Sequence, residues 1–127
     1  MALNGLMARI LVAEDDSSMR FFLEKALARA GHEVTVADDG VHALQILTER
    51  KNFDLLLADI VMPGMDGIEL SQKATDLMPG LKVMFITGFA AVAMNQKDAA
   101  PRGQARVMSK PFHLNELVGQ IDDILAA

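Results

Sequence analysis

Five short apolar runs recur along the chain, separated by stretches whose apolar residues have helical spacing. Each run is bounded by charged, Gly or Pro residues. Strands that alternate with helices form a parallel sheet covered on both faces, because parallel neighbours need a crossover connection. The sequence therefore predicts an α/β fold, with the first, third and fourth runs at the centre of the sheet. The five predicted strands are residues 10–13, 33–37, 54–58, 82–86 and 106–109.

Helical spacing is clearest after the first run and at the end of the chain. Apolar residues between positions 19 and 30, Phe22 among them, share one face of a helix that Ser17 or Asp16 can cap and Gly31 can end. A similar stripe covers residues 114–125. Both stripes are typical of surfaces that pack against a sheet.

The stretch between the fourth and fifth runs is irregular. It begins with helical spacing, but Pro101 and Gly103 predict a fourth helix that is short or partly replaced by a loop. Residues 1–6 are interpreted as an N-terminal extension and residues 7–127 as one domain, the usual outcome for 127 residues.

Composition and charge exclude several classes of function. The chain has no Cys, which removes disulfides, thiolate metal sites and thiol nucleophiles. Its net charge of −5 argues against DNA binding, because no basic stripe is available to replace counterions. No apolar stretch reaches the roughly 18 residues of a membrane span. We therefore expect a soluble, cytoplasmic protein that binds neither DNA nor a membrane.

Polar residues follow four of the five predicted strands. In an open parallel sheet the ligand site lies beyond the carboxyl ends of the strands, so these side chains should meet at one edge. A single Asp at a strand end is more often a loop cap, but an acidic pair, a second acid, a hydroxyl and a lysine at four such ends indicate a functional site. They are Glu14-Asp15-Asp16, Asp59, Thr87-Gly88 and Lys110-Pro111.

Electrostatics narrows what this edge can bind. Asp15 and Asp59 at about 5 Å would repel each other by roughly 3 kcal/mol at an effective dielectric constant near 20. Lys110 offsets part of this repulsion, and a pocket of carboxylates, carbonyl and water is also what Mg²⁺ prefers. A magnesium site suits phosphoryl transfer, with Asp59 as the acceptor. Lys110 and the Thr87 hydroxyl would then contact phosphoryl oxygens.

These residues resemble the receiver domain of two-component response regulators over essentially the whole chain from residue 7 to 127. The resemblance implies a flavodoxin-like sheet of five parallel strands in the order 2-1-3-4-5, with five helices on its two faces. It also implies phosphorylation of Asp59. The matching motifs are Ile10–Asp16, Asp59–Gly67, Ile86–Gly88 and Ser109–Phe112.

The resemblance implies a role for each residue of the site. Mg²⁺ would be bound by Asp15, Asp59 and the backbone carbonyl of Val61, with Glu14 acting through water. Thr87 would be the switch hydroxyl, Lys110 would contact the phosphoryl group, and the Lys110-Pro111 peptide would be cis. The family usually has an aromatic residue three positions before its lysine, where this chain has Val107. That departure puts the usual coupling of threonine to the aromatic residue in doubt.

The implied function is that of a stand-alone switch. Only the last helix follows Lys110, so we expect no effector domain and an output through contact with another protein. The phosphoryl donor would be a histidine kinase or a histidine phosphotransferase. A closer resemblance to small single-domain cell-cycle regulators implies an adaptor role toward the protease ClpXP through ClpX, and recruitment to a cell pole.

Three alternatives remain, one within the phosphorelay and two from other classes of protein. The protein could pass phosphoryl groups between histidine kinases, or it could be a small Mg²⁺-dependent phosphatase with an aspartyl intermediate. A short chain without Asp-x-Asp at the strand end disfavours the phosphatase, so we expect no enzyme activity beyond weak self-phosphorylation and self-dephosphorylation. A nucleotide- or flavin-binding module would need a phosphate-cradling loop where this chain has three acids.

Overall fold

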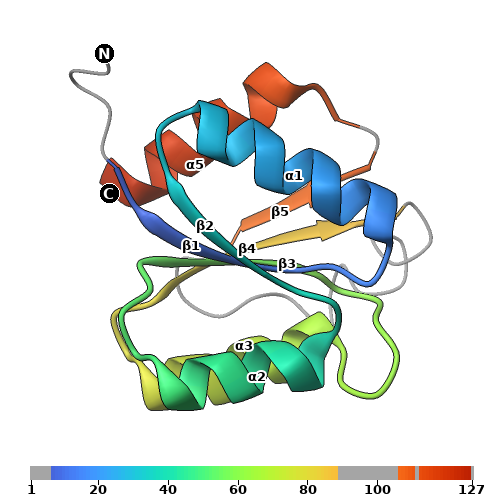
Figure 1. Ribbon diagram of the computed structural model, residues 1–127, viewed down its shortest axis with the longest axis vertical. Coiled ribbons are helices and arrows are strands. Elements are labelled where there is room, and N and C mark those ends of the chain that lie inside the picture. The colour runs from blue at the N-terminus through green and yellow to red at the C-terminus, as the bar shows by residue number, and fades with distance from the viewer. Residues whose placement is uncertain (1–6, 89–105, 111, 127) are drawn as a thin grey trace.

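A computed structural model describes residues 7–88, 106–110 and 112–126 of the chain (Figure 1). The strands differ from the predicted runs by at most one residue at either end. In chain order the elements are β1 (Arg9–Ala13), α1 (Ser17–Arg29), β2 (Glu33–Ala37), α2 (Gly40–Glu49), β3 (Leu55–Asp59), α3 (Gly67–Leu77), β4 (Lys82–Thr87), β5 (Arg106–Ser109) and α5 (Leu114–Ala126).

The five strands form one parallel sheet in the order β2-β1-β3-β4-β5. Ala13 at the end of β1 pairs with Ala37 of β2 and with Ala58 of β3, so these three strands end at the same edge. The predicted α/β fold with order 2-1-3-4-5 is confirmed, as is the central position of β1, β3 and β4. The predicted extension at 1–6 and the predicted irregular fourth helix lie outside the described residues.

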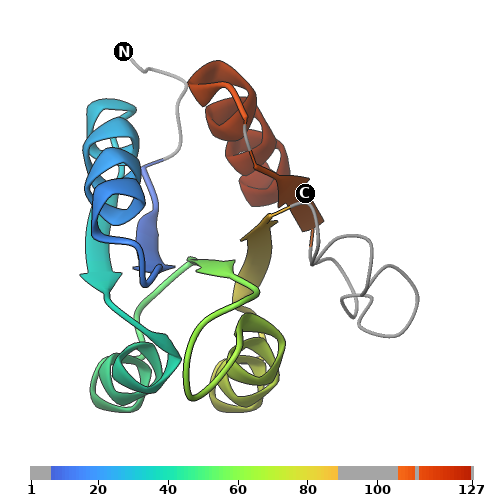
Figure 2. The same cartoon turned by 90° about the vertical axis from the view of Figure 1, so that its right-hand side faces the viewer.

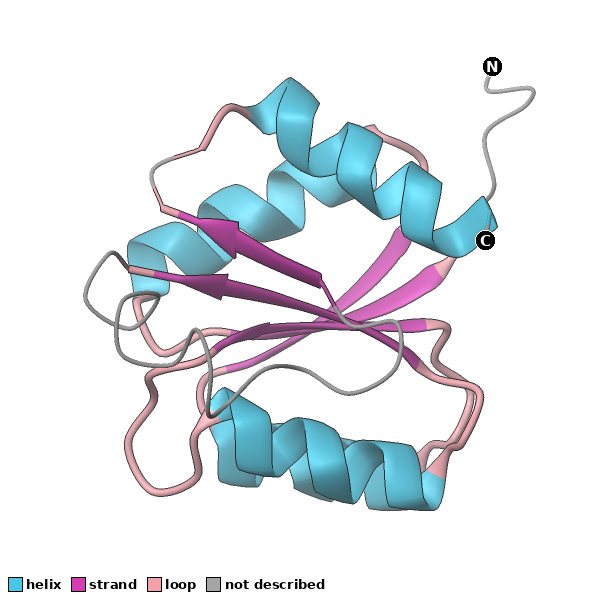
Figure 3. Cartoon of the chain, turned by 180° about the vertical axis from the view of Figure 1, so that it is seen from behind, coloured by secondary structure: helices cyan, strands magenta, loops and turns pink. Residues whose placement is uncertain are grey.

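Each face of the sheet is covered by a pair of helices (Figure 3). Because successive side chains of a strand point to opposite faces, Leu56 of β3 joins the core under α2 and α3, and Leu57 joins the core under α1 and α5. Every residue of β3 is buried, which explains why its sequence is continuously apolar until Asp59. The sheet therefore holds Asp59 at the end of a strand that is buried along its whole length.

Local signals in the sequence set the ends of α1. The Asp16 carboxylate accepts a hydrogen bond of 3.0 Å from the Met19 amide, so the predicted helix cap is confirmed for Asp16. Gly31 has a φ of 101°, a conformation that favours glycine, and it ends the helix as predicted. Phe22 differs from the expectation, since it is 43% exposed at the margin of the buried stripe.

His32 links the amino-terminal edge of the sheet to α5. Its imidazole Nδ1 accepts a hydrogen bond of 3.1 Å from the Ala8 amide, and its Nε2 lies 4.0 Å from the Asp122 carboxylate. Burial lowers the pKa of His32 below 6.5, and the charge of Asp122 opposes this shift only partly. The neutral imidazole is therefore the form that the fold stabilises.

We expect His32 to weaken the fold in acid. Below pH 6.5 the unfolded chain binds a proton at His32 that the native state resists, so stability falls as pH decreases from 6.5. Urea unfolding followed by circular dichroism, for wild type and His32→Asn at pH 5 and pH 8, measures this effect. The advantage of the wild type should be smaller at pH 5, and an advantage independent of pH would contradict the prediction.

No helix in the described part of the chain combines the length and the apolar character that crossing a bilayer requires.

Candidate functional site

The strands bring their polar termini together at one edge of the sheet. Figure 2 looks onto this edge, where β1, β3, β4 and β5 end side by side. Glu14 and Asp15 directly follow β1, Asp59 is the last residue of β3, Thr87 ends β4, and Lys110 directly follows β5. Residues from four distant parts of the sequence thus converge as predicted.

Three carboxylates form a compact cluster at this edge. Oxygen atoms of Glu14, Asp15 and Asp59 all lie within 4.8 Å of one another. Glu14 and Asp59 are buried and Asp15 is exposed, so the cluster opens to solvent on one side. Oxygen ligands with room for several water molecules fit Mg²⁺. Among residues 7–88, 106–110 and 112–126, this is the one group of at least three carboxylate or imidazole side chains with such spacing.

Lys110 joins two of these carboxylates. Its Nζ lies 3.0 Å from Oδ2 of Asp59 and 3.2 Å from Oε1 of Glu14. Burial works against the charge of Lys110, but the hydrogen bonds and charges of Asp59 and Glu14 outweigh it and raise the pKa of the lysine. Lys110 is therefore a permanent cation at the site, as the electrostatic argument from the sequence requires.

Glu14 is the most deeply buried acid of the cluster. Its side chain is inaccessible to solvent, while its Oε2 accepts a hydrogen bond of 3.1 Å from the Asp16 amide. Burial, helped by the charge of Asp59, raises the pKa of Glu14 to about 7, although the Asp16 amide and Lys110 act in the opposite direction. Around pH 7 Glu14 therefore carries a proton in part of the molecules, and a bound cation would have to displace that proton.

We expect the raised pKa of Glu14 to make the metal-free protein less stable as pH rises. Between pH 4.5 and about 7 the native state binds a proton at Glu14 that the unfolded chain does not, so stability decreases with increasing pH in this window. Urea unfolding in EDTA at pH 5 and pH 8 tests this. Glu14→Gln should gain stability relative to wild type at the higher pH, and a difference that does not change with pH would refute the shift.

The loop after β3 is folded tightly around Asp59. The Val61 amide donates a hydrogen bond of 3.2 Å to Oδ1 of Asp59, so both oxygens of this carboxylate have a partner. The Gly67 amide donates to the Ile60 carbonyl at 2.8 Å, and a Cβ at Gly67 would overlap the backbone carbonyl of Asp59. The first turn of α3 is thus in direct contact with the backbone that carries Asp59.

Thr87 and Val107 lie on neighbouring strands. Thr87 is buried, and its hydroxyl donates to the Gly88 carbonyl at 3.4 Å. Val107 pairs with Phe85 in the β4–β5 register and is 44% exposed. Position 107, where the resemblance described above implies an aromatic ring, therefore holds an exposed aliphatic side chain. The predicted cis peptide at Pro111 lies outside the described residues.

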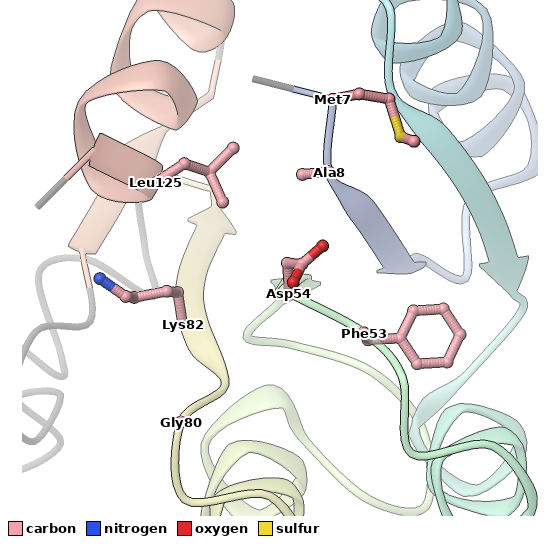
Figure 4. A pocket seen from close by; sticks show the side chains of 7 residues that line it. All are labelled: Met7, Ala8, Phe53, Asp54, Gly80, Lys82 and Leu125. Atoms are coloured by element: carbon pink, nitrogen blue, oxygen red, sulfur yellow. The ribbon is translucent and has the colours of Figure 1, made fainter.

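A pocket of about 300 Å³ lies at the opposite edge of the sheet (Figure 4). Its walls include Met7 and Phe53, which lie in the loops before β1 and β3, Lys82, which begins β4, and Leu125 in the last turn of α5. None of the predicted site residues lines it. The candidate site is therefore the acidic edge rather than this cavity.

One contact of the site was missed by the sequence reasoning. Nη1 of Arg20, on the first turn of α1, donates a hydrogen bond of 2.8 Å to the backbone carbonyl of Glu14. The position of a basic residue one turn into the helix is a weak signal, since most such residues face solvent. Only the folded backbone shows that this carbonyl is within reach.

Comparison with known proteins shows which protein family the chain resembles. The model described as "Response regulator receiver domain" matches residues 10–122. The chain is 59% identical to "Response regulator receiver protein CpdR" of Brucella abortus, covering 95% of this chain and 99% of the relative. It is 38% identical to the DNA-binding transcriptional regulator NtrC of Escherichia coli, covering 89% of this chain but 24% of that longer protein.

Solved structures show the same arrangement. The receiver domain from the hybrid histidine kinase CckA has a TM-score of 0.75 at 31% identity, covering 92% of this chain and 98% of the other. The response regulator TrrA from Thermotoga maritima, solved in complex with Mg²⁺ and BeF, has a TM-score of 0.80 at 27% identity, covering 93% and 99%.

Proposed function

Because the chain belongs to the response regulator receiver domain family, we propose that it is a phosphoacceptor switch whose acceptor is Asp59. The donor is a phosphohistidine on a histidine kinase or a histidine phosphotransferase. The observation that carries this proposal is the placement of the Asp59 carboxylate, 3.0 Å from the Lys110 ammonium and within the cluster formed with Glu14 and Asp15.

The transfer needs positioning more than covalent chemistry from the protein. An oxygen of Asp59 forms a bond to phosphorus while the phosphorus–nitrogen bond of the donor breaks, and the imidazole nitrogen leaves with that electron pair. Lys110 exchanges its contact with Asp59 for a phosphoryl oxygen, and the Thr87 hydroxyl turns from the Gly88 carbonyl to another.

Glu14, Asp15, Asp59 and the Val61 carbonyl are the groups that would hold Mg²⁺. The ion, when bound, would neutralise charge on the phosphoryl oxygens. The cluster fits this role, because it supplies oxygen ligands only and leaves one side open for water and the phosphoryl group. Self-phosphorylation and self-dephosphorylation would be slow side reactions of this site, so turnover of phosphate esters is not expected.

We place the output in a contact with another protein. The relative CpdR is matched over 99% of its length, which supports a regulator that works without an attached effector. The resemblance to single-domain cell-cycle regulators favours a cytoplasmic adaptor for ClpX that is recruited to a cell pole and switched off by phosphorylation. No membrane or DNA contact is part of this proposal.

Phosphorylation is tested by incubating the protein with Mg²⁺ and acetyl phosphate and measuring its intact mass. Wild type should gain the mass of one phosphoryl group, whereas Asp59→Asn should gain none. Asp76→Asn, an exposed position on α3, should behave as wild type. A stable modification of Asp59→Asn would overturn the assignment, and rapid hydrolysis of p-nitrophenyl phosphate by wild type would favour the phosphatase alternative.

The adaptor role needs its own experiment. Purified ClpX is mixed with wild type or with Asp59→Asn, with and without beryllofluoride as the phosphoryl mimic, and binding is measured. Wild type should lose its binding when the mimic is added, and Asp59→Asn should keep it. Equal binding in all four conditions, or none, would exclude ClpX as the partner of the switch.

A further inference from the structure

Asp15 is the exposed member of the acidic cluster and has the fewest constraints of its own. Its side chain makes no hydrogen bond or ion pair with any residue in the described parts of the chain. An exposed carboxylate without partners samples several rotamers, and fixing one of them costs free energy when a cation binds. Whatever orients Asp15 must therefore act through the backbone on either side of it.

The two peptide groups that flank Asp15 are both held. A peptide group is planar, so fixing its carbonyl also fixes the amide and the direction of the next Cα. The carbonyl between Glu14 and Asp15 accepts the Arg20 hydrogen bond of 2.8 Å. The amide between Asp15 and Asp16 donates to the Glu14 carboxylate at 3.1 Å. Asp15 therefore lies between two peptide planes that are both held by hydrogen bonds, and one of these bonds comes from Arg20.

Arg20 can hold the Glu14 carbonyl without neutralising the carboxylates of the cluster. In the described part of the chain its guanidinium forms no ion pair with Glu14, Asp15 or Asp59, so it leaves the carboxylates free to bind a cation. A hydrogen bond from a charged donor to a carbonyl is shorter and stronger than a neutral one. The backbone of Arg20 is part of α1, and its amide donates a hydrogen bond of 2.8 Å to the Asp16 carbonyl. The helix therefore anchors the donor.

We infer that Arg20 is a positioning residue, which orients Asp15 toward the cation by holding the Glu14–Asp15 peptide through the Glu14 carbonyl. The inference rests on the proposed function, because it assigns Arg20 to the Mg²⁺ cluster. Groups that orient metal ligands without touching the metal change metal affinity by about 10- to 100-fold when they are removed. Asp15 is one ligand of the set, so the lower end of that range applies.

The experiment compares Mg²⁺ binding by calorimetry in wild type, Arg20→Ala, Arg20→Lys and Arg29→Ala. Arg29 lies in the last turn of the same helix and is exposed, so Arg29→Ala removes the same charge at the far end of α1. We expect the Kd for Mg²⁺ to rise about tenfold in Arg20→Ala and less than twofold in Arg29→Ala. Arg20→Lys, which can still donate to the carbonyl, should recover most of the affinity.

A second measurement needs no metal. Nitrogen-15 relaxation of the Asp15 amide in EDTA should show a lower order parameter in Arg20→Ala than in wild type or Arg29→Ala. An unchanged order parameter, or a Kd within twofold of wild type for Arg20→Ala, would overturn the inference. Wild-type protein that binds no Mg²⁺ would instead overturn the proposed function. If Arg20→Ala does not fold, Arg20→Met, which keeps the aliphatic part of the side chain but has no donor for the Glu14 carbonyl, should show the same two changes.

Discussion

Replacing Lys110 by methionine will lower the free energy of unfolding of the metal-free protein by about 3 kcal/mol at pH 8. Lys110 is the cation between Asp59, at 3.0 Å, and Glu14, at 3.2 Å. Without it two buried carboxylates face each other with no compensating charge. The loss should be smaller at pH 6, because the variant can then protonate Glu14, whose pKa is already about 7 in the wild type.

Urea unfolding followed by circular dichroism, with and without Mg²⁺, measures this effect. Saturating Mg²⁺ should recover part of the stability of Lys110→Met by replacing the lost charge. Lys73→Met is the matched control, since Lys73 is an exposed lysine on α3 that lies 3.9 Å from Glu69, and its loss should not exceed about 0.5 kcal/mol. Equal losses in the two variants would show that Lys110 is not the charge that balances the cluster.

Replacing Gly67 by alanine will destabilise the protein by about 3 kcal/mol, although alanine is the better helix former. The new Cβ would overlap the backbone carbonyl of Asp59 and would lie 3.0 Å from Cα of Ile60. Both are backbone atoms at the end of the fully buried strand β3, so they cannot move without disturbing the sheet. Any adjustment also shifts Asp59, so phosphorylation by acetyl phosphate should be slowed as well.

At Gly119 in α5 we expect a substitution by alanine to have the opposite effect on stability. A Cβ at Gly119 in α5 has no atom within 4 Å, so Gly119→Ala should stabilise the protein by about 0.5 to 1 kcal/mol. Unfolding of the two variants under the same conditions separates the effect of the Cβ contact from that of helix propensity. Stabilisation by both substitutions would show that the backbone around Asp59 can yield.

The elements and their order could be predicted from the sequence because their signals are local. Five apolar runs and the stripes between them follow from the spacing of side chains in strands and helices. The cap at Asp16 and the end of α1 at Gly31 depend on residues within one turn of the helix. The prediction that Phe22 is buried was wrong, since an apolar stripe defines one face of a helix but not how far the sheet extends beneath the margin of that face.

Which side chains meet at the acidic edge could be predicted too, but their pKa values and backbone contacts could not. Parallel strands that end at one edge bring Glu14, Asp59 and Lys110 together by topology alone. The pKa of Glu14 depends on how many atoms bury it, which no spacing along the chain reveals. The Arg20 contact with the Glu14 carbonyl depends on the path of the backbone between β1 and α1.

By itself, the sequence determined a parallel α/β domain of the receiver family with an acidic edge that faces a lysine, because strand alternation and strand-end chemistry are properties of neighbouring residues. The tertiary structure decided which acid is buried, which carboxylate has a raised pKa, and which glycine cannot carry a side chain. These properties depend on distances between segments far apart in the chain, and such distances exist only once the sheet has formed.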